Sequence, residues 1–407
     1  MEYFDTLETR PPEERERALM ARLPKQIAYA KAHAPWFAES LREVDPMTVT
    51  SREALARLPV VRKHELIEMQ KKRPPFGGLV AVGLGRIGRV FASPGPIYEP
   101  EGREADYWRT ARALFAAGFR AGDLVHNSFS YHMTPGAWIL EGGALALGCT
   151  VFPGGVGQTE QQLQAMADLQ PQGYVGTPSF LRILLERADA LGLSIPSLKK
   201  ALVSGEAFLP AQREALAARG IMGFQAYATA DLGVIAYETP AREGLVVDEE
   251  VIVEIVRPGT GDPVPEGEVG EVVVTTFNST YPLIRFGTGD LSAVLPGPSP
   301  CGRTNMRIRG WLGRADQTAK VKGMFVHPEQ IAAVVKRHPE IRRARLVLTN
   351  PDGVDRMTLH CEAPPIEGLA ARIAESLREL TKLRGEVLFV DALPNDGKVI
   401  SDERKFD

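Results

Sequence analysis

The sequence predicts an α/β protein with a parallel sheet, followed by a smaller α+β module at its C-terminal end. The first observation is an alternation of short apolar runs and helix-length segments between residues 124 and 218, typical of βαβ units. The second is a change to period-two patterning after residue 249, which indicates an antiparallel β subdomain. The third is length, because 407 residues are too many for one ordinary core.

Composition and charge narrow the function classes. Hydrophobic residues make up 44% of the chain and charged residues 24%, as in ordinary globular proteins. The formal net charge of -3 gives no electrostatic reason to expect nucleic acid or a membrane surface as a partner. The N-terminus lacks a basic start and an apolar core, so we expect no secretion signal, and no run is apolar enough to span a bilayer. Three widely spaced cysteines favour reduced thiols and a cytoplasmic location.

The N-terminal region is predicted to be helical. Apolar residues recur at helical spacing over residues 12–34, and shorter helices are expected over 51–58, with Ser51 as a cap, and over 63–72. We interpret all three as scaffold. Short strands are expected at 80–83 and from residue 89, beside a turn-rich segment that could cradle phosphate with backbone N–H groups. Two prolines and Glu99 favour a simple turn there instead.

The central region is predicted to form the parallel sheet. Strands are expected over 124–127, 149–152, 173–175 and 200–203, and helices over 138–147, 159–169, 177–190 and 210–218. Ligands in such sheets bind at the carboxyl ends of the strands. That rule singles out three polar turns, at Ser128–Pro135, Thr177–Ser179 and Ser204–Glu206.

The segment from Tyr227 to Gly233 is predicted to be a loop with binding chemistry. Its ring, hydroxyl and carboxylate could stack a base, bond a phosphate and hold a divalent cation. Mg²⁺ prefers one or two carboxylates plus phosphate oxygens, which fits the single Asp231. The alternative is an exposed loop in which Asp231 caps the residues that follow, and residue chemistry does not separate the two.

The C-terminal part begins with strands expected at 251–256 and 271–276. An apolar strand from Pro282 then ends in a Gly-Thr-Gly turn that presents Asp290, and a second turn presents Arg314. A carboxylate and a guanidinium so placed can grip a ribose and its phosphate, and the surrounding glycines suggest a hinge. Helices at 328–337 and 367–380 and strands at 343–350, 356–362 and 386–390 suggest a ferredoxin-like module, which ends with Lys398 on a glycine turn.

Together these segments resemble the adenylate-forming acyl-CoA synthetase superfamily, and within it the phenylacetate–CoA ligase family. The resemblance covers nearly the whole chain. It implies a large adenylate-forming domain over residues 1–315 and a C-terminal lid over residues 316–407. The motifs that carry it are Ala34-Pro35-Trp36-Phe37, Val125-His126-Asn127, Gly148-Cys149-Thr150-Val151, Val175 to Ser179, Ser204-Gly205-Glu206, Tyr227 to Gly233, Arg285 to Leu291, Gly313 to Gly323 and Gly397-Lys398.

The resemblance implies a role for each matching residue. The ATP- and AMP-binding residues would be Ser93, Gly205, Glu206, Ala207, Tyr227, Ala228, Asp290 and Arg314. Within that set, residues 205–207 would line the adenine, Tyr227 would stack on it and Asp290 would bind the ribose. Asp231 would hold Mg²⁺. Lys398 would be catalytic, because a cation placed where charge develops on the α-phosphate stabilises the transition state.

Further roles concern the lid and the acyl group. Asp316 and Gln317 would form the hinge, and Gly323 would lie on the lid loop that reaches the site for the thioester step. Phe129, Tyr131 and His132 would line the acyl pocket, where an aromatic wall suits a flat ring or a short acyl chain. The family also suggests a homodimer.

Two departures from the family pattern affect function. Of the family's hydroxyl- and glycine-rich phosphate loop, Ser93 and Gly95 are nearly all that remain over residues 92–99. Of the zinc-binding cysteine set of some relatives, Cys301 alone remains, and one thiolate cannot make a structural zinc site, so we predict no zinc.

These observations predict an AMP-forming acid–CoA ligase for an aromatic or small carboxylic acid. ATP, Mg²⁺ and coenzyme A would be its cofactors and small-molecule partners. One alternative is an adenylating enzyme that passes its acyl group to another acceptor, such as a carrier protein or an amine. The other is a nucleotide- or acyl-binding homologue that has lost the chemistry, for which the altered phosphate loop is the motive.

Overall fold

The computed structural model describes residues 2–93, 97–315, 319–321, 324–351 and 355–404. The chain forms two compact units. Unit 1 comprises Met1–Val253, Val274–Phe286 and Leu295–Gly310, and unit 2 comprises Glu254–Val273, Gly287–Val294 and Trp311–Asp407. The predicted domain boundary between residues 315 and 316 adjoins residues outside the described ranges and stays a prediction.

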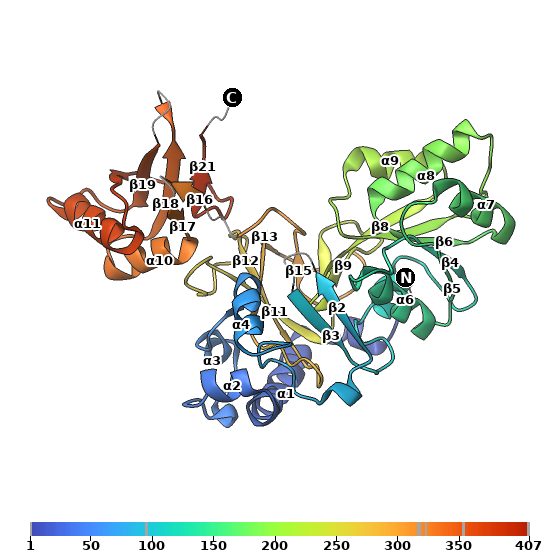
Figure 1. Ribbon diagram of the computed structural model, residues 1–407, viewed down its shortest axis with the longest axis horizontal. Helices are drawn as coiled ribbons and strands as arrows, with labels where there is room; N and C mark the ends of the chain where they lie inside the picture. Colours follow the sequence, from blue (N-terminus) through green and yellow to red (C-terminus); the bar gives the residue numbers. More distant parts are fainter. Residues whose placement is uncertain (1, 94–96, 316–318, 322–323, 352–354, 405–407) are drawn as a thin grey trace. The chain divides into compact units, whose positions relative to one another are not determined.

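A nine-stranded sheet is the frame of unit 1 (Figure 1). Its strand order is β14-β15-β10-β9-β8-β7-β6-β4-β5, and the strands from β8 to β5 are parallel. The strand bounds are β4 Leu124–Asn127, β5 Thr150–Pro153, β6 Gly173–Gly176, β7 Lys200–Val203, β8 Met222–Thr229, β9 Gly233–Tyr237, β10 Leu245–Val247, β14 Val294–Leu295 and β15 Arg307–Ile308. The predicted parallel α/β core is confirmed.

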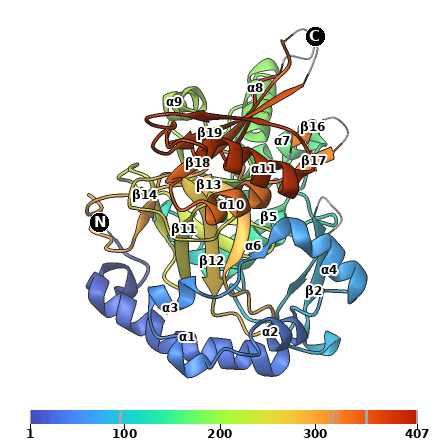
Figure 2. The same cartoon turned by 90° about the vertical axis from the view of Figure 1, so that its left-hand side faces the viewer.

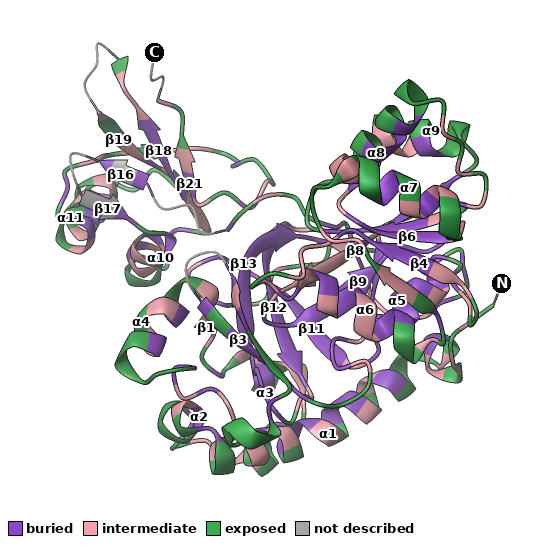
Figure 3. Cartoon of the chain, turned by 45° about the vertical axis from the view of Figure 1, so that its right-hand side comes forward, coloured by how far each residue is buried: buried purple, intermediate pink, exposed green. Residues whose placement is uncertain are grey.

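Helices cover both faces of this parallel region (Figure 1). Helices α5 (Ala111–Ala116) and α6 (Gly136–Ala146) pack on one face, where Val125, Val175 and Leu202 are buried. Helices α7 (Thr159–Leu169), α8 (Pro178–Ala190) and α9 (Pro210–Ala218) pack on the other, against Tyr174 and Val203. Strands β6 and β7 are buried between these helices, which explains their apolar residues, and Figure 3 shows β4 and β6 as buried.

Helices at the N-terminus form a separate layer of unit 1. Their bounds are η1 Thr6–Thr9, α1 Pro12–His33, α2 Pro35–Ser40, η2 Pro46–Thr48, α3 Arg52–Ala56, η3 Lys63–Glu65 and α4 Leu66–Lys72, with β1 at Val61–Arg62. The predicted cap is confirmed, because the Ser51 hydroxyl accepts from the Ala54 N–H at 3.2 Å. The strand predicted at 80–83 is wrong. That segment makes one bond to Thr280, through the Ala81 N–H, and then enters the 3₁₀ turn η4 (Leu84–Arg86).

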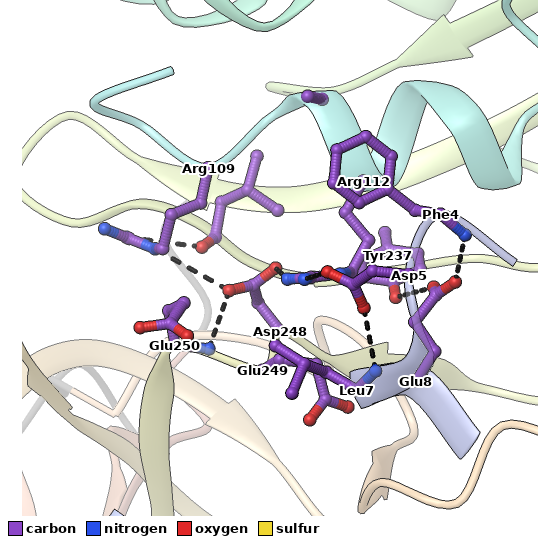
Figure 4. A network of polar contacts seen from close by, with 12 residues as sticks. Phe4, Asp5, Leu7, Glu8, Arg109, Arg112, Tyr237, Asp248, Glu249 and Glu250 are labelled. Atoms are coloured by element: carbon purple, nitrogen blue, oxygen red, sulfur yellow. Dashed lines mark hydrogen bonds and ion pairs between the residues drawn. The ribbon is translucent and has the colours of Figure 1, made fainter. Parts of the chain in front are cut away.

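A polar network joins the N-terminal segment to the rest of unit 1 (Figure 4). The Tyr237 hydroxyl donates to Glu8 at 2.8 Å, and the Phe4 N–H donates to the same carboxylate at 2.6 Å. Arg112 donates to the fully buried Asp248 at 3.1 Å. Since these charges are buried and paired, we interpret the network as structural.

A second, four-stranded sheet contains the unit boundaries, because the divisions after residues 253, 273 and 286 fall within its strands. Its order is β1-β13-β12-β11, with bounds β11 Val251–Val256, β12 Gly270–Thr276 and β13 Phe286–Ser292. The turn predicted at Gly287–Gly289 is wrong, because these residues belong to β13. The Thr288 hydroxyl donates to the Val272 carbonyl at 3.0 Å, which a sequence reading of Gly-Thr-Gly as a turn could not foresee.

Unit 2 contains a compact α+β module. Its four-stranded sheet has the order β20-β19-β18-β21, and α10 and α11 cover one face (Figure 2). The bounds are β16 Ala319–Val321, β17 Met324–Val326, α10 Pro328–Arg337, β18 Arg343–Thr349, β19 Arg356–Glu362, α11 Leu369–Thr381, β20 Glu386–Phe389 and β21 Ile400–Asp402. The predicted helices and strands are confirmed to within two residues, while β21, parallel to β18, was not predicted.

Candidate active site

The three polar turns singled out from the sequence lie at one edge of the parallel sheet. They follow β4, β6 and β7, which are neighbours in the sheet. The Ser128 N–H donates to the Val175 carbonyl at 2.8 Å, and the Ser204 N–H donates to the Gly176 carbonyl at 3.2 Å. The Ser179 hydroxyl donates to the Glu206 carboxylate at 2.7 Å. The structure therefore brings these turns together as the topology predicts.

Gly205, Glu206 and Ala207 are exposed on the turn after β7. Gly205 has a φ of +82°, a conformation that favours glycine. A Cβ at this position would lie 3.6 Å from the Phe129 ring, so the turn after β7 lies beside the turn after β4. This exposed, polar edge is the part of unit 1 where the sequence places the adenine.

The three predicted acyl-pocket residues occupy different environments. Phe129 packs against the buried core of the sheet, whereas His132 is exposed. The Tyr131 hydroxyl donates to Glu141 at 2.5 Å and accepts from Asn127 at 3.0 Å. Burial and the bond to Glu141 raise the Tyr131 pKa, so this residue stays a neutral phenol. Their assignment to the acyl pocket stays a prediction.

A cavity of about 580 Å³ lies near this turn. Its lining includes Trp138 and Glu141 of α6 and Trp108, and none of the three predicted acyl-pocket residues. The Tyr131 ring meets the Trp138 ring edge-on at 5.1 Å, and Arg89 lies over the Trp138 ring at 4.0 Å. The sequence reading missed Trp138 as a candidate because it lies within a predicted helix.

His126, in β4, is linked by hydrogen bonds to the turn that follows this strand. Its Nε2 hydrogen bonds to the Gln162 carbonyl oxygen at 2.7 Å, which also accepts from the Ser128 hydroxyl at 3.1 Å. Gln162 in turn donates to the carbonyls of Gly155 and Gly157. Burial lowers the pKa of His126, more strongly than the bond to Gln162 raises it. A neutral imidazole therefore holds this network.

The segment predicted as a loop from Tyr227 is a strand and a tight turn. Tyr227 and Ala228 lie in β8, which pairs with β9 through a bulge between these two residues. Asp231 lies in the turn that joins β8 to β9. The loop prediction is wrong because the antiparallel pairing with β9 extends β8 to Thr229.

Asp231 is buried, so the alternative of an exposed capping residue is also wrong. The Leu232 N–H instead donates to the Thr229 hydroxyl at 3.2 Å. Lys63 Nζ lies 2.6 Å from Asp231 Oδ2, and the Asp231 side chain is 0% exposed. Its Oδ1 is buried without a hydrogen-bond partner in the described part of the chain. An unsatisfied anionic oxygen of this kind fits a bound cation.

Glu99 is a second buried carboxylate in this region. One of its oxygens accepts from the Ser93 N–H at 3.2 Å, and the other accepts from the Ser93 hydroxyl. Burial first, and then the negative charge of Asp231, raises the pKa of Glu99 to about 8, against the opposing effects of Ser93 and Lys63. The two carboxylates therefore interact electrostatically. Ser93 ends β2 (Arg89–Ser93), which pairs with β3 (Ile97–Glu101), and its hydroxyl is committed to Glu99.

Asp290 forms the candidate ribose site of unit 2. Its Oδ1 accepts from Arg314 at 2.9 Å and from the Trp311 indole N–H at 3.1 Å. Asp290 and Arg314 are also joined by an isolated antiparallel bridge. The Asp290 side chain is 11% exposed and that of Arg314 is 47% exposed, so a nearly buried carboxylate is paired with an exposed guanidinium. The sequence predicted this pair but did not single out Trp311 as a site residue. Its position two residues before Gly313, at the start of the second turn, could have suggested it.

Lys398 lies on the predicted glycine turn, also within unit 2. Its N–H donates to Asp396 at 3.1 Å, its carbonyl accepts from Arg345 at 3.0 Å, and its side chain is exposed. Gly397 has a φ of +69°, and a Cβ there would lie 2.7 Å from Val269 and 3.1 Å from Leu291. The turn therefore packs closely beside the strand that carries Asp290.

Three predicted residues cannot be placed. Asp316, Gln317 and Gly323 lie outside the described residues. Among the residues that are described, no three or more His, Cys, Asp or Glu side chains form a group that could hold a metal. No described helix combines the length and apolarity needed to cross a membrane.

Comparison with known proteins identifies the family. Residues 108–280 match the family model for AMP-binding enzymes. The chain is 34% identical over 360 residues to phenylacetate–coenzyme A ligase of Thermus thermophilus. The aligned residues cover 84% of this chain and 79% of the relative. It is 31% identical over 385 residues to the enzyme of the same name from Aromatoleum evansii, over 90% of this chain and 86% of that one. The chain belongs to the phenylacetate–CoA ligase family.

Solved structures agree with this membership. A crystal structure of 2-hydroxyisobutyryl-CoA ligase with R3-HIB-AMP has a TM-score of 0.73 and 26% identity, and covers 98% of this chain and 91% of that one. Another with 2-HIB-AMP and CoA has a TM-score of 0.72 and 27% identity, covering 98% and 92%. The predicted fold class and the class of AMP-forming acid–CoA ligases are confirmed, which implies use of ATP and CoA. The two alternatives are not favoured.

Proposed function

We propose that this ligase activates an aromatic, phenylacetate-like acid or a small carboxylic acid and converts it to the CoA thioester. The observation that carries the proposal is the 34% identity with a phenylacetate–coenzyme A ligase over 84% of the chain. The polar turns after β4, β6 and β7 support it, because ligands of parallel sheets bind at this edge.

The proposed reaction has two steps. In the first, a carboxylate oxygen of the acid attacks the α-phosphorus of ATP, and the bond to the β-phosphate breaks, so that pyrophosphate leaves. In the second, the CoA thiolate attacks the acyl carbon, and the C–O bond to AMP breaks. Lys398 would offset the negative charge that builds on the α-phosphate oxygens in the first step, as expected for a cation placed at developing charge.

Each unit carries residues that are expected to bind the nucleotide. In unit 1, Gly205, Glu206 and Ala207 would line the adenine, and the Tyr227 ring, next to Ala228, would stack on it. In unit 2, Asp290 would accept from the ribose hydroxyls and Arg314 would contact ribose and phosphate. The bonds of Arg314 and Trp311 to one Asp290 oxygen support this, because they fix the carboxylate in one orientation. Ser93 remains a weak candidate, since its hydroxyl is bonded to Glu99.

Asp231 is the residue that would hold Mg²⁺. Its buried oxygen without a hydrogen-bond partner supports this role. When bound, Mg²⁺ would neutralise charge on the ATP phosphates.

The remaining assignments are proposals as well. Asp316 and Gln317 would form the hinge of a C-terminal lid, and Gly323 would lie on its CoA-facing loop. Phe129, Tyr131 and His132 would contribute separately to acyl binding, with Phe129 the best placed because its ring lies beside Gly205. A cytoplasmic location is supported by three cysteines that form no disulfide. A homodimer rests on the family alone.

Pyrophosphate release tests the proposed function. The purified protein is given ATP, Mg²⁺ and a panel of aryl and short-chain acids, with and without CoA. We expect release with at least one acid and formation of its thioester when CoA is present. An adenylate without thioester would favour another acyl acceptor. ATP binding without release for any acid would favour a homologue that has lost the chemistry.

A further inference from the structure

Arg345 is a buried charged residue on the face of the C-terminal sheet opposite α10 and α11. Its neighbours in β18, Leu346 and Leu348, are buried in the core that these helices form with the sheet. Because side chains one or three residues apart on a strand point to opposite faces, Arg345 points away from that core. It is nevertheless only 7% exposed. A guanidinium buried outside the core needs polar partners, and segment 394–398 supplies them.

The guanidinium bonds to both ends of segment 394–398, which carries Lys398. Its Nε donates to the Lys398 carbonyl at 3.0 Å, and a terminal nitrogen donates to the Pro394 carbonyl at 3.2 Å. The same nitrogen donates to the Asp396 carboxylate, which accepts from the Lys398 N–H at 3.1 Å. Both backbone polar groups of Lys398 are therefore bound, one directly by Arg345 and the other through Asp396.

A second set of bonds in unit 2 holds the same segment. The Val269 N–H donates to the Asn395 side-chain oxygen at 3.0 Å, and the Asn395 amide donates to the Gly267 carbonyl at 3.3 Å. Gly397 leaves no room for a side chain, because a Cβ there would lie 2.7 Å from Val269. The backbone of the segment is thus fixed, while the Lys398 side chain remains exposed.

We propose that Arg345 is a positioning residue for Lys398, because it fixes the backbone from which the catalytic ammonium extends. The proposal rests on the proposed function, in which Lys398 acts in adenylate formation, whereas Arg345 and its bonds come from the structure. The planar guanidinium can hold several acceptors at once in a fixed geometry, which a lysine cannot. Displacement of a catalytic group by about 1 Å can cost about 10²-fold in rate, so this support matters for the first step.

Arg345→Met tests the proposal, since it keeps an unbranched apolar stem and removes the donors. We expect pyrophosphate release under single-turnover conditions to fall about tenfold or more, with the acid that gives release in the wild type. Thioester formation from preformed acyl adenylate should change less than about twofold, because Lys398 is assigned to the first step alone. Asp396→Ala should show the same pattern, and its 40% exposed side chain makes misfolding a lesser concern. Equal losses in both steps would overturn the proposal.

Arg404→Met is the matched control. Its side chain is 7% exposed, against 8% for Arg345, and it is also paired with aspartates of unit 2. Those partners are Asp402 and Asp355, at 2.6 and 2.9 Å. The variant should form adenylate as the wild type does. A loss as large as that of Arg345→Met would mean that any buried guanidinium of this unit has the same effect, which would also overturn the proposal.

A double variant separates positioning from stability. If Arg345 acts through Lys398, Arg345→Met should lower adenylate formation by less than about twofold when Lys398→Ala is already present. A residue that only stabilises the fold would lower the rate equally in both backgrounds. If Lys398→Ala alone had no effect, the role of Lys398 and this proposal would both fail. If Lys398→Ala lowered the rate and Arg345→Met did not, this proposal alone would fail.

Hydrogen exchange tests the support without any substrate. Exchange of the peptide that contains residues 394–399, followed by mass spectrometry, reports how firmly this backbone is held. We expect it to be several-fold faster in Arg345→Met than in the wild type and unchanged in Arg404→Met. Equal exchange in all three proteins would overturn the proposal even if no acid gave pyrophosphate release.

Discussion

The two units of this ligase each carry an aspartate paired with a basic side chain, but in different surroundings. Asp231 in unit 1 is 0% exposed, and one of its oxygens lacks a partner within the described structure. Asp290 in unit 2 is 11% exposed, and a single oxygen accepts from both Arg314 and Trp311. The Asp231 carboxylate is fully buried with one oxygen lacking a partner, whereas the Asp290 carboxylate is nearly buried and one of its oxygens accepts from two side chains.

This difference teaches what each aspartate is suited to bind. A buried oxygen that lacks a donor is costly in the free protein and is compensated when a cation arrives, so Asp231 suits a metal. The Asp290 carboxylate accepts from Arg314 and Trp311, which offset its burial in the free protein and fix its orientation, so it offers a defined acceptor for sugar hydroxyls. The two aspartates thus offer different binding chemistry.

Lys398→Ala tests the charge that unit 2 supplies, and it should have the largest effect. We expect adenylate formation to fall about 10²–10³-fold, because a cation at developing charge acts mainly in the transition state. The measurement is pyrophosphate release under single-turnover conditions. Thioester formation from preformed acyl adenylate is the control and should be nearly unchanged. Equal loss in both steps would mean that Lys398 acts in binding or lid closure instead.

Exchanging the two aspartates for asparagine separates their roles. We expect Asp290→Asn to weaken ATP binding about 10- to 100-fold, since a hydrogen bond to a charged group is worth about 1.5–3 kcal/mol. Isothermal titration calorimetry without metal measures this. The same variant should bind Mn²⁺ normally in the absence of nucleotide. Asp231→Asn should lose Mn²⁺ affinity and keep the ATP affinity measured without metal. If both variants lost both affinities, the two aspartates would not have separate roles.

Acid should destabilise unit 1 through His126. Its folded-state pKa lies below the ordinary value of 6.5, so the unfolded chain binds the proton more readily. Stability is complete above pH 6.5 and is lost as the pH falls below it, at up to about 1.4 kcal/mol per pH unit. Urea unfolding between about pH 8 and about pH 5 measures the loss. His126→Gln should show a shallower loss; equal slopes would exclude His126 as the cause.

Sequence reasoning was strongest where structure is set locally. Helices α7 and α9 were predicted to the residue, because apolar spacing and the prolines and polar residues at their ends are local signals. The glycine turn before Lys398 was predicted for the same reason, and its φ of +69° explains the glycine.

Features that depend on contacts between distant segments could not be predicted from the sequence. Lys63 and Asp231 are 168 residues apart, so a helix read as scaffold gave no sign of its lysine's partner. Gly287–Gly289 reads as a turn, yet the bond from Thr288 to Val272 holds it in β13. The phosphate loop was recognised as altered, but the interaction of Glu99 with Asp231 depends on the β2–β3 pairing and on the β8–β9 turn.

Trp311→Phe should have the smallest effect on ATP binding, and it tests whether Trp311 only orients Asp290. Phenylalanine keeps the ring but removes the indole N–H that lies 3.1 Å from Asp290, while Arg314 keeps its bond to the same oxygen. The Trp311 side chain is also 55% exposed, so we expect ATP affinity to fall only about fivefold, equivalent to about 1 kcal/mol. The ATP-dependent change in tryptophan fluorescence should be lost in this variant and kept in Trp138→Phe. A loss of affinity as large as that of Asp290→Asn would mean that the indole itself contacts the nucleotide, so that Trp311 would be a binding residue rather than a positioning one.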